Sequence, residues 1–398
     1  MASSGAPRAF LHVGLPKTGT SYLQSLVWAN LAELRRQGLV VVPDPGTPAS
    51  AESSARLMHA LRGRLVAGHD DATSAEVLDR FAAEVAAAGD ADVLLTQEQL
   101  AGCRRPQVRT LLDRLAGREV HVVVTARAVS RQVPSAWQER VKSRSTISYS
   151  DFVLAARDRT EAARGFWRNQ DLLDVLARWG EALPPEQVHV VTVPLSGAGR
   201  DELAHRYCGV LGVDAARLEL EQARSNSSLG FTQAELLRRV NLALGERLPK
   251  PRLGYARVAR WYLTEKFLLP QGGRAPLLPQ SAEAWCRALS QEWIDGIRRA
   301  GYAVTGDLAD LLPDAAHFSA DLPEAAETDQ LDAAVRALAD LLVDRHEEIG
   351  RLDALHAHVR ELESQQAHQT QQGEVSAPAT AASRRGRWRA RAPWRGRR

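Results

Sequence analysis

Ten consecutive residues, His12 to Ser21, carry the strongest chemical signal in this sequence. They read His-Val-Gly-Leu-Pro-Lys-Thr-Gly-Thr-Ser and follow an apolar stretch suited to a buried strand. Apolar residues then recur with helical spacing, at Tyr22, Leu23, Leu26, Val27 and Leu31. A glycine-containing turn from a strand into a helix exposes backbone N–H groups at the positive end of the helix dipole, which favours phosphate or sulfate. The sequence therefore predicts an anion-binding loop.

The spacing of this loop is close to that of a Walker A motif but departs from it at one position. That motif requires Gly-x-x-x-x-Gly-Lys-[Ser/Thr], with the lysine directly after the second glycine. Gly14 and Gly19 have the required separation, but Thr20 occupies the lysine position and Lys17 lies inside the loop. A nucleotide triphosphatase would lose its contact to the β- and γ-phosphates. A donor with one transferable group on a 5′-phosphate would not need a lysine there.

A second phosphate-binding element is expected about a hundred residues later. His121–Thr125 is a β-branched run of strand character, Arg127 follows it, and Ser135 comes eight residues after the arginine. A guanidinium matches the face of a phosphate bidentately, and a hydroxyl adds one more donor. Arg127 alone would be interpreted as a surface arginine, but the order and spacing of the two elements match those of a known enzyme family.

Together, the two elements resemble sulfotransferases that use 3′-phosphoadenosine 5′-phosphosulfate (PAPS). The resemblance covers roughly residues 8–230, and its specificity lies in the two short motifs. It implies that Arg127 and Ser135 grip the 3′-phosphate. Many family members have Arg-Asp-Pro, whereas Ala128 and Val129 follow the arginine here and Pro134 precedes the serine. The resemblance also assigns the 5′-phosphosulfate to the first loop, whose candidate binding residues are Pro16, Lys17, Thr18, Gly19, Thr20 and Ser21.

The chemistry implied is in-line transfer of a sulfuryl group from PAPS, with 3′-phosphoadenosine 5′-phosphate (PAP) as product. By analogy with phosphoryl transfer, catalysis would consist mostly of positioning and electrostatic stabilisation. Lys17 is the candidate cation for the leaving oxygen, and Glu98, after a predicted central strand, is the candidate general base. A helix-capping or surface role is the alternative for Glu98, and His59 and His69 are weaker candidates for the base. We expect no metal.

The acceptor expected from the resemblance is a hydroxyl or amine of a carbohydrate or glycolipid. One alternative function is a P-loop nucleotide kinase or triphosphatase, against which the displaced lysine and the Arg127/Ser135 pair argue. A non-catalytic PAP-binding scaffold is the other. Tryptophans of the helical second half, including Trp261, suit stacking on sugars, although packing in the core is the commoner role. Residues 224–229, Arg-Ser-Asn-Ser-Ser-Leu, either close over the ligands or cap the following helix.

Composition places the chain among ordinary globular proteins. Its 398 residues are 44% hydrophobic and 25% charged, and three scattered cysteines form neither a zinc motif nor a disulfide framework. No apolar run approaches the roughly 20 residues that span a bilayer. We therefore expect a cytoplasmic protein, with membrane-peripheral attachment as an option.

The formal net charge of +3 depends on a basic tail. Residues 384–398 contain eight arginines and no acidic residue, so residues 1–383 carry −5. Two tryptophans among these arginines suit an anionic membrane surface or another polyanion. The alternative is a disordered tail without a dedicated partner. We expect no specific nucleic-acid partner.

Strand-like segments alternate with helical patterns in the first half of the chain, which predicts an α/β fold with a mostly parallel sheet. The resemblance refines this to a P-loop-like three-layer sulfotransferase domain over residues 1–320. Helices are predicted at Glu76–Ala87, Leu172–Glu181, Leu203–Leu211 and Gln233–Leu244. The expected strands are Phe10–Gly14, Leu39–Val42, Val93–Thr96, Val120–Thr125 and Val188–Val193.

A change of pattern near residue 325 predicts a C-terminal helical extension. Apolar residues from Leu331 to Leu362 recur at spacings of three and four among charged residues, which indicates an amphipathic helix over 325–364. Such a helix either pairs two subunits in a homodimeric coiled coil or folds back onto the domain, since Arg345, His346 and His356 interrupt the pattern. Residues 365–398 are expected to form a disordered linker and the arginine-rich tail.

Overall fold

Six strands form one sheet in which every neighbouring pair is parallel, in the order β2-β3-β1-β4-β5-β7. The computed structural model describes residues 5–44, 53–65, 72–195, 200–220, 228–248 and 254–375. The strands of this sheet are β1 (Arg8–Gly14), β2 (Leu39–Val41), β3 (Asp92–Thr96), β4 (Glu119–Ala126), β5 (Val188–Thr192) and β7 (Ala303–Thr305). Two short strands, β6 (Leu278–Pro279) and β8 (Phe318–Ser319), pair separately.

The α/β fold and all five predicted strands are confirmed, with boundaries within two residues of those expected. The central strands are buried on both faces, which is why they read as continuous apolar runs rather than as alternating patterns. The sheet is entirely parallel, whereas a mostly parallel one was expected. The sequence prediction missed β7, a three-residue strand in which Val304 is exposed, because so short a run carries no periodic signal.

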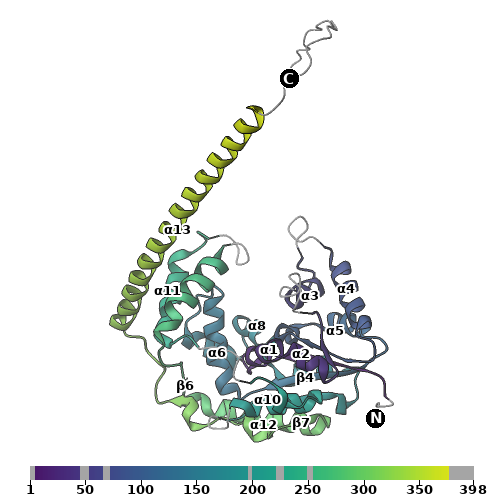
Figure 1. Ribbon diagram of the computed structural model, residues 1–398. Coiled ribbons are helices and arrows are strands. Elements are labelled where there is room, and N and C mark those ends of the chain that lie inside the picture. Colours follow the sequence, from purple (N-terminus) through teal and green to yellow (C-terminus); the bar gives the residue numbers. More distant parts are fainter. Residues whose placement is uncertain are drawn as a thin grey trace, which may run out of the picture. The chain divides into compact units, whose positions relative to one another are not determined.

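Helices cover both faces of the sheet (Figure 1). Three of the four predicted helices lie within α4 (Ser74–Ala87), α10 (Arg200–Leu211) and α11 (Phe231–Leu244), and the fourth, predicted to end at Glu181, corresponds to α9 (Leu172–Trp179) and ends two residues earlier. The α-helices of the structure are α1 (Thr20–Ala29), α2 (Leu31–Arg36), α3 (Ser53–Leu61), α4 (Ser74–Ala87), α5 (Arg105–Asp113), α6 (Val129–Lys142), α7 (Tyr149–Arg157), α8 (Arg164–Gln170), α9 (Leu172–Trp179), α10 (Arg200–Leu211), α11 (Phe231–Leu244), α12 (Glu283–Ala300) and α13 (Glu327–Val375).

Shorter helical segments fill the connections between these elements. Three of them bear on the site: η1 (Glu98–Gly102) directly after β3, the π-helical η5 (Ala256–Leu268), and η9 (Ala315–His317) before β8. The others are η2 (Glu161–Ala163), η3 (Pro185–Gln187), η4 (Ala215–Arg217), η6 (Leu269–Gln271), η7 (Gln280–Ala282) and η8 (Leu308–Leu311).

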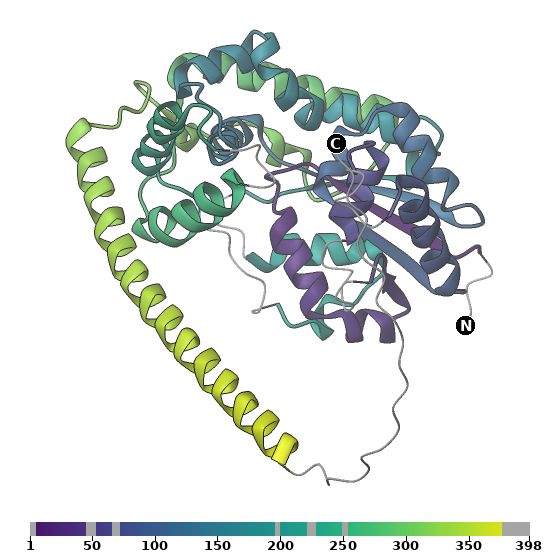
Figure 2. The same ribbon diagram turned by 90° about the horizontal axis from the view of Figure 1, so that it is seen from above.

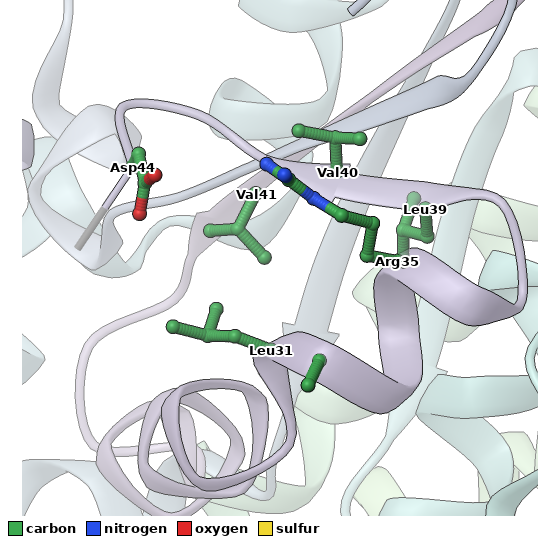
Figure 3. Close-up of a pocket in the computed structure, with 7 residues that line it drawn as sticks. Leu31, Arg35, Leu39, Val40, Val41 and Asp44 are labelled. Atoms are coloured by element: carbon green, nitrogen blue, oxygen red, sulfur yellow. The ribbon is translucent and has the colours of Figure 1, made fainter. Parts of the chain in front are cut away.

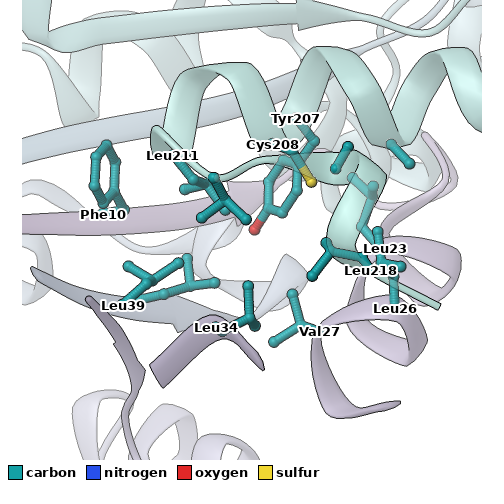
Figure 4. Close-up of a cluster of buried hydrophobic side chains, with 14 of the residues drawn as sticks. Phe10, Leu23, Leu26, Val27, Leu34, Leu39, Tyr207, Cys208, Leu211 and Leu218 are labelled. Atoms are coloured by element: carbon teal, nitrogen blue, oxygen red, sulfur yellow. The ribbon is translucent and has the colours of Figure 1, made fainter. Parts of the chain in front are cut away.

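One hydrophobic core lies between the sheet and helices α1, α2 and α10 (Figure 4). Leu23 and Leu26 of α1 and Tyr207 of α10 are almost completely buried against strand residues such as Phe10. This packing fixes α1 directly behind β1, because the apolar stripe that predicted the helix is the face that the helix buries. The start of α1, and with it the loop that connects it to β1, is therefore held in place.

The chain divides into two units, residues 1–337 and 338–398. The first contains the sheet and its helices. The second contains most of α13, which continues without interruption to Val375, eleven residues past the boundary at 364 that the sequence suggested (Figure 2). The basic tail, 384–398, lies outside the described residues. None of the described helices is long and apolar enough to cross a lipid bilayer.

The strand order brings three loops together. Strand β1 lies between β3 and β4, and all three are parallel, so the segments that follow them leave from the same edge of the sheet. These segments contain Lys17 after β1, Glu98 after β3 and Arg127 after β4. In open parallel sheets the carboxyl ends of the strands are the usual place for ligands.

Candidate functional site

The loop after β1 has a backbone conformation that two of its glycines make accessible. Gly14, Lys17 and Gly19 all have positive φ angles, of 117°, 68° and 88°. A Cβ atom on Gly14 would lie 2.9 Å from the carbonyl oxygen of Glu98, and one on Gly19 would lie 2.6 Å from Cδ2 of Leu203. Gly14 is therefore required for space as well as for conformation, because its neighbour is backbone, whereas Gly19 is required for its conformation.

Neighbouring elements hold this loop through hydrogen bonds. The Leu15 backbone N–H donates to the carbonyl oxygen of Thr125 on β4 (3.0 Å), and the Thr125 hydroxyl donates to the carbonyl oxygen of Gly14 (3.0 Å). The Thr18 hydroxyl donates to the carbonyl oxygen of Leu15 (2.5 Å), and the Gln170 amide on α8 donates to that of Pro16 (2.7 Å). The loop is thus tied to β4 and α8 and braced by one hydrogen bond of its own.

A buried histidine lies beneath the loop. The side chain of His12 is fully buried, with Nδ1 2.9 Å from the Thr96 hydroxyl and Nε2 3.5 Å from the Thr125 hydroxyl. Burial lowers the pKa of His12 to about 3, so the imidazole is neutral at physiological pH. His12 therefore serves as an uncharged spacer between β3 and β4 under the loop.

The backbone N–H groups from Lys17 to Ser21 have no acceptor among the described residues. Thr20 and Ser21 begin α1, so their N–H groups belong to the first turn, which has no intrahelical partners. No acidic residue lies in that turn. The end of the helix can therefore accommodate an anion that its own sequence does not supply.

Lys17 belongs to a charged cluster that spans three elements. Its Nζ atom lies 3.5 Å from Oε2 of Glu139 on α6, and the guanidinium of Arg260 on η5 lies 2.6 Å from Oε1 of the same carboxylate. Burial alone would raise the pKa of Glu139, but the nearby charges of Lys17, Arg260 and Lys142 outweigh it and lower the pKa. Glu139 is therefore ionised between these cations.

Glu98 faces this cluster from the start of η1. The Thr20 hydroxyl donates a hydrogen bond to Oε2 of Glu98. Burial raises the pKa of Glu98, and the negative charge of Glu139 adds to this increase. The hydrogen bond from Thr20 and the positive charge of Lys17 lower the pKa but do not cancel the effect of burial. The structure thus places a carboxylate with enhanced basicity beside the lysine and the first turn of α1.

Arg127 approaches the loop from the end of β4. Its Nη1 donates to the carbonyl oxygen of Lys17 (3.1 Å), while its buried Nε has no partner among the described residues. Burial, together with the like charge of Arg131, lowers the pKa of Arg127 to about 9, so the guanidinium is still charged at neutral pH. A buried donor without an acceptor is costly and marks a place where a ligand can supply one.

Ser135 lies on α6, half-buried, and its hydroxyl makes no hydrogen bond with a described residue. Helix α6 begins at Val129, so Pro134 lies inside it, where the missing N–H leaves the Ser130 carbonyl without its helical donor. No hydrogen bond joins Ser135 to Arg127, and Ser135 lies on α6 one helical turn before Glu139.

Sequence reasoning missed several residues that the structure places at this edge. Glu139 follows Ser135 by four residues on α6, so helical periodicity gave a usable signal for it. Arg260 and His317 gave none, since both come from distant segments. The Ser130 hydroxyl lies 2.8 Å from Nδ1 of His317. Burial is the largest cause that lowers the pKa of His317, and the positive charges of Arg131 and Arg127 lower it further.

The remaining candidate residues have more limited roles in this arrangement. The Thr18 hydroxyl is completely buried within the loop, and the Thr20 hydroxyl is engaged by Glu98, so only their backbone N–H groups are available to a ligand. Pro16 contributes its carbonyl oxygen to Gln170. His59 lies on α3, whereas His69 and residues 224–227 lie outside the described residues.

An open depression elsewhere on the surface contains none of the candidate residues. It lies between α2 and the edge strand β2 and is lined by Leu31, Ala32, Arg35, Leu39, Val40, Val41 and Asp44 (Figure 3). Within the described part of the chain, no group of His, Cys, Asp and Glu side chains is arranged to hold a metal ion. Comparisons with protein-family models, with curated proteins and with solved structures found no match to this chain.

Proposed function

We propose that this protein is a PAPS-dependent sulfotransferase built on a P-loop-like, three-layer α/β domain, with a carbohydrate or glycolipid as acceptor. One observation carries the proposal: Lys17 and the free N–H groups of the loop, Glu98, and Arg127 come from three adjacent parallel strands and meet at one edge of the sheet. A cation, an anion cradle, a base and a second phosphate ligand are the parts that such a transfer requires.

The residues present suit a nucleotide with two phosphate groups. The N–H groups of Lys17–Ser21, at the start of α1, would hold the 5′-phosphosulfate, as no described residue occupies them. Arg127 would hold the 3′-phosphate with the Nε and Nη groups that remain free, aided by Ser135. The requirement for glycine at positions 14 and 19 also fits a loop whose backbone must approach a ligand closely.

PAPS supplies a mixed anhydride, in which the bond from sulfur to the bridging oxygen breaks as a bond from sulfur to the acceptor oxygen forms. Lys17 is positioned to stabilise the negative charge that develops on the leaving oxygen. Glu98 is positioned to take the proton from the acceptor hydroxyl, and its raised pKa makes it a stronger base than an exposed glutamate. Lys17 must first break its ion pair with Glu139.

An exposed tryptophan on η5 supports a sugar as the acceptor. Trp261 is 59% exposed, whereas Trp167 and Trp293 are buried in the core. An exposed indole suits stacking on the apolar face of a pyranose ring. A kinase or triphosphatase would need a lysine at Thr20, whose hydroxyl instead binds Glu98.

Calorimetry with PAP and with adenosine 5′-phosphate tests the donor site. We expect PAP to bind at least about tenfold more tightly, a difference of about 1.4 kcal/mol that reflects the 3′-phosphate. No binding of PAP, or equal binding of both nucleotides, would overturn the proposal. Transfer from radiolabelled PAPS to a panel of glycans and glycolipids then distinguishes an enzyme from a scaffold, which would bind PAP without turnover.

A further inference from the structure

Helix α13 carries an unusual concentration of exposed apolar side chains. Of the nineteen large hydrophobic residues that are exposed in the described part of the chain, ten lie on this one helix, with exposures from 41% to 68%. A contiguous apolar stripe of this kind marks an interaction surface. The ten are Leu331, Val335, Leu338, Leu342, Val343, Ile349, Leu352, Leu355, Val359 and Leu362.

These residues follow a heptad repeat. Seven of the ten fall at alternating spacings of four and three, the a and d positions of a coiled coil. Leu355 and Leu362 occupy flanking g positions, and only Val343 lies off the stripe. We name the a and d positions of the second structural unit the α13 seam: Leu338, Leu342, Arg345, Ile349, Leu352, His356, Val359 and Glu363.

The start of α13 is held by a different face of the helix. Ala333 and Ala337 are buried, the Arg239 guanidinium donates to the Gln330 side chain (3.1 Å), and the Gln271 amide donates to the carbonyl oxygen of Ala333 (3.1 Å). These contacts lie within the first unit and do not use the heptad positions. The heptad positions take no part in these contacts, and a helix of the same repeat is the partner that a heptad fits.

A parallel, in-register pair of α13 helices would place like charges together. Each seam residue would face its own copy, so Arg345 would face Arg345 and Glu363 would face Glu363. At the flanks, Glu348 would lie opposite Asp353 of the second copy, twice by symmetry. Arg345 already pairs with Glu348 of its own chain (2.7 Å), and a parallel dimer offers that guanidinium no further acceptor.

An antiparallel pair whose midpoint lies between residues 350 and 351 of both helices removes these like-charge contacts. In antiparallel coiled coils a positions face d positions, so Ile349 would face Leu352 and Leu342 would face Val359 of the other copy. The two polar interruptions, Arg345 and His356, would then face each other, where the imidazole can accept from the guanidinium.

The flanks of the antiparallel pair are complementary as well. In this register Leu341 faces Leu362 of the second copy, and His346 faces Asp353. Two contacts are mixed: Leu338 faces Glu363 at each end of the pair, where solvent reaches the carboxylate, and Glu348 faces Leu355 on the outer flank. Polar residues that must match in a seam are a known means of specifying register and orientation. We infer that α13 pairs two copies of this chain as an antiparallel coiled coil centred between residues 350 and 351.

Site-directed cross-linking of the full-length protein tests this arrangement. An equimolar mixture of Leu342→Cys and Val359→Cys chains, one carrying a tag that changes its size, should form a disulfide-linked heterodimer on mild oxidation. Leu342→Cys alone should stay unlinked, because its two copies would lie 17 residues apart along the helix, about 25 Å, far beyond disulfide reach. The native Cys103, Cys208 and Cys286 are buried, which limits their participation.

Light scattering and one matched substitution complete the test. The unmodified protein should show twice the chain mass of 43.6 kDa. Asp340→Cys, at an exposed position off the seam, should give no cross-link. A monomeric mass, or equal cross-linking by Asp340→Cys, would overturn the dimer. A disulfide formed by Leu342→Cys alone would show a parallel pair and overturn the orientation.

Discussion

The Nζ atom of Lys17 lies 3.5 Å from a carboxylate oxygen of Glu139, so the cation proposed for the reaction is already paired within the protein. Arg260 shares the same carboxylate. A donor phosphosulfate must therefore compete with Glu139 for Lys17, and its own negative charge must approach that of Glu139. Glu139 thus lowers the affinity for the donor, and a neutral residue at this position would remove that effect.

Replacing Glu139 by glutamine should tighten PAP binding several-fold, because Lys17 then loses its ion-pair partner. The measurement is calorimetric titration with PAP at low ionic strength, where the charge effect is least screened. Glu181→Gln is a suitable control, since Glu181 pairs with Arg105 and Arg109 away from the site. Weaker binding by Glu139→Gln would show instead that Glu139 organises the site.

Replacing Glu98 by glutamine should lower kcat by about 10² to 10⁴, the range that a general base contributes, and leave PAP affinity nearly unchanged. The raised pKa gives a second expectation. Activity requires the ionised carboxylate, so the acid limb of the pH–rate profile should lie above the ordinary glutamate pKa of 4.5. An acid limb at or below 4.5, or a normal rate in Glu98→Gln, would assign the base to another residue.

The same substitution should raise stability at neutral pH. A carboxyl whose folded pKa is raised binds its proton more tightly in the folded protein, so its ionisation destabilises the fold as pH rises above 4.5. Glutamine removes that cost and can still accept from Thr20. Thermal unfolding of the wild type and of Glu98→Gln at pH 7 and pH 4 measures this effect. The variant should have the higher Tm at pH 7, and the difference in Tm should be smaller at pH 4.

Replacing Arg127 by lysine should abolish the preference for PAP over adenosine 5′-phosphate. Lysine keeps the positive charge but lacks the planar fork that grips a phosphate bidentately, and it loses the bond to the Lys17 carbonyl oxygen. Affinity for adenosine 5′-phosphate should change little, which separates loss of the 3′-phosphate contact from a collapsed loop. Retained discrimination would exclude Arg127 as the ligand of that group.

The strands and the loop were predictable because their signals are local. Gly14, Lys17 and Gly19 lie within six residues of one another, and a buried parallel strand reads as an unbroken apolar run. The spacing did not reveal that Thr18 turns its hydroxyl into the loop rather than toward a ligand. That orientation depends on Thr125, more than a hundred residues away.

The charged partners of the site were not predictable for the same reason. Helical spacing could have indicated Glu139, which lies one turn after Ser135. Arg260 contacts Glu139 from η5, and no local sequence pattern connects η5 to α6. The α13 seam was predictable only in part. Its heptad spacing was evident in the sequence, and the structure confirms one continuous helix over that stretch.

The buried His12 should make the protein sensitive to acid. Its pKa is about 3 in the folded chain and 6.5 when unfolded, so the unfolded state binds the extra proton throughout that interval. Stability should therefore fall as pH drops below 6.5, by up to about 1.4 kcal/mol per pH unit for one proton. Chemical unfolding at several pH values compares wild type with His12→Asn, whose slope should be smaller by one proton. His189→Asn is the matched control, because burial lowers the pKa of His189 to about 4 at a position away from the loop, and it should reduce the slope only above that pH. An unchanged slope in His12→Asn would mean that His12 is protonated in the folded protein, and the hydrogen bonds beneath the loop would have to be reassigned.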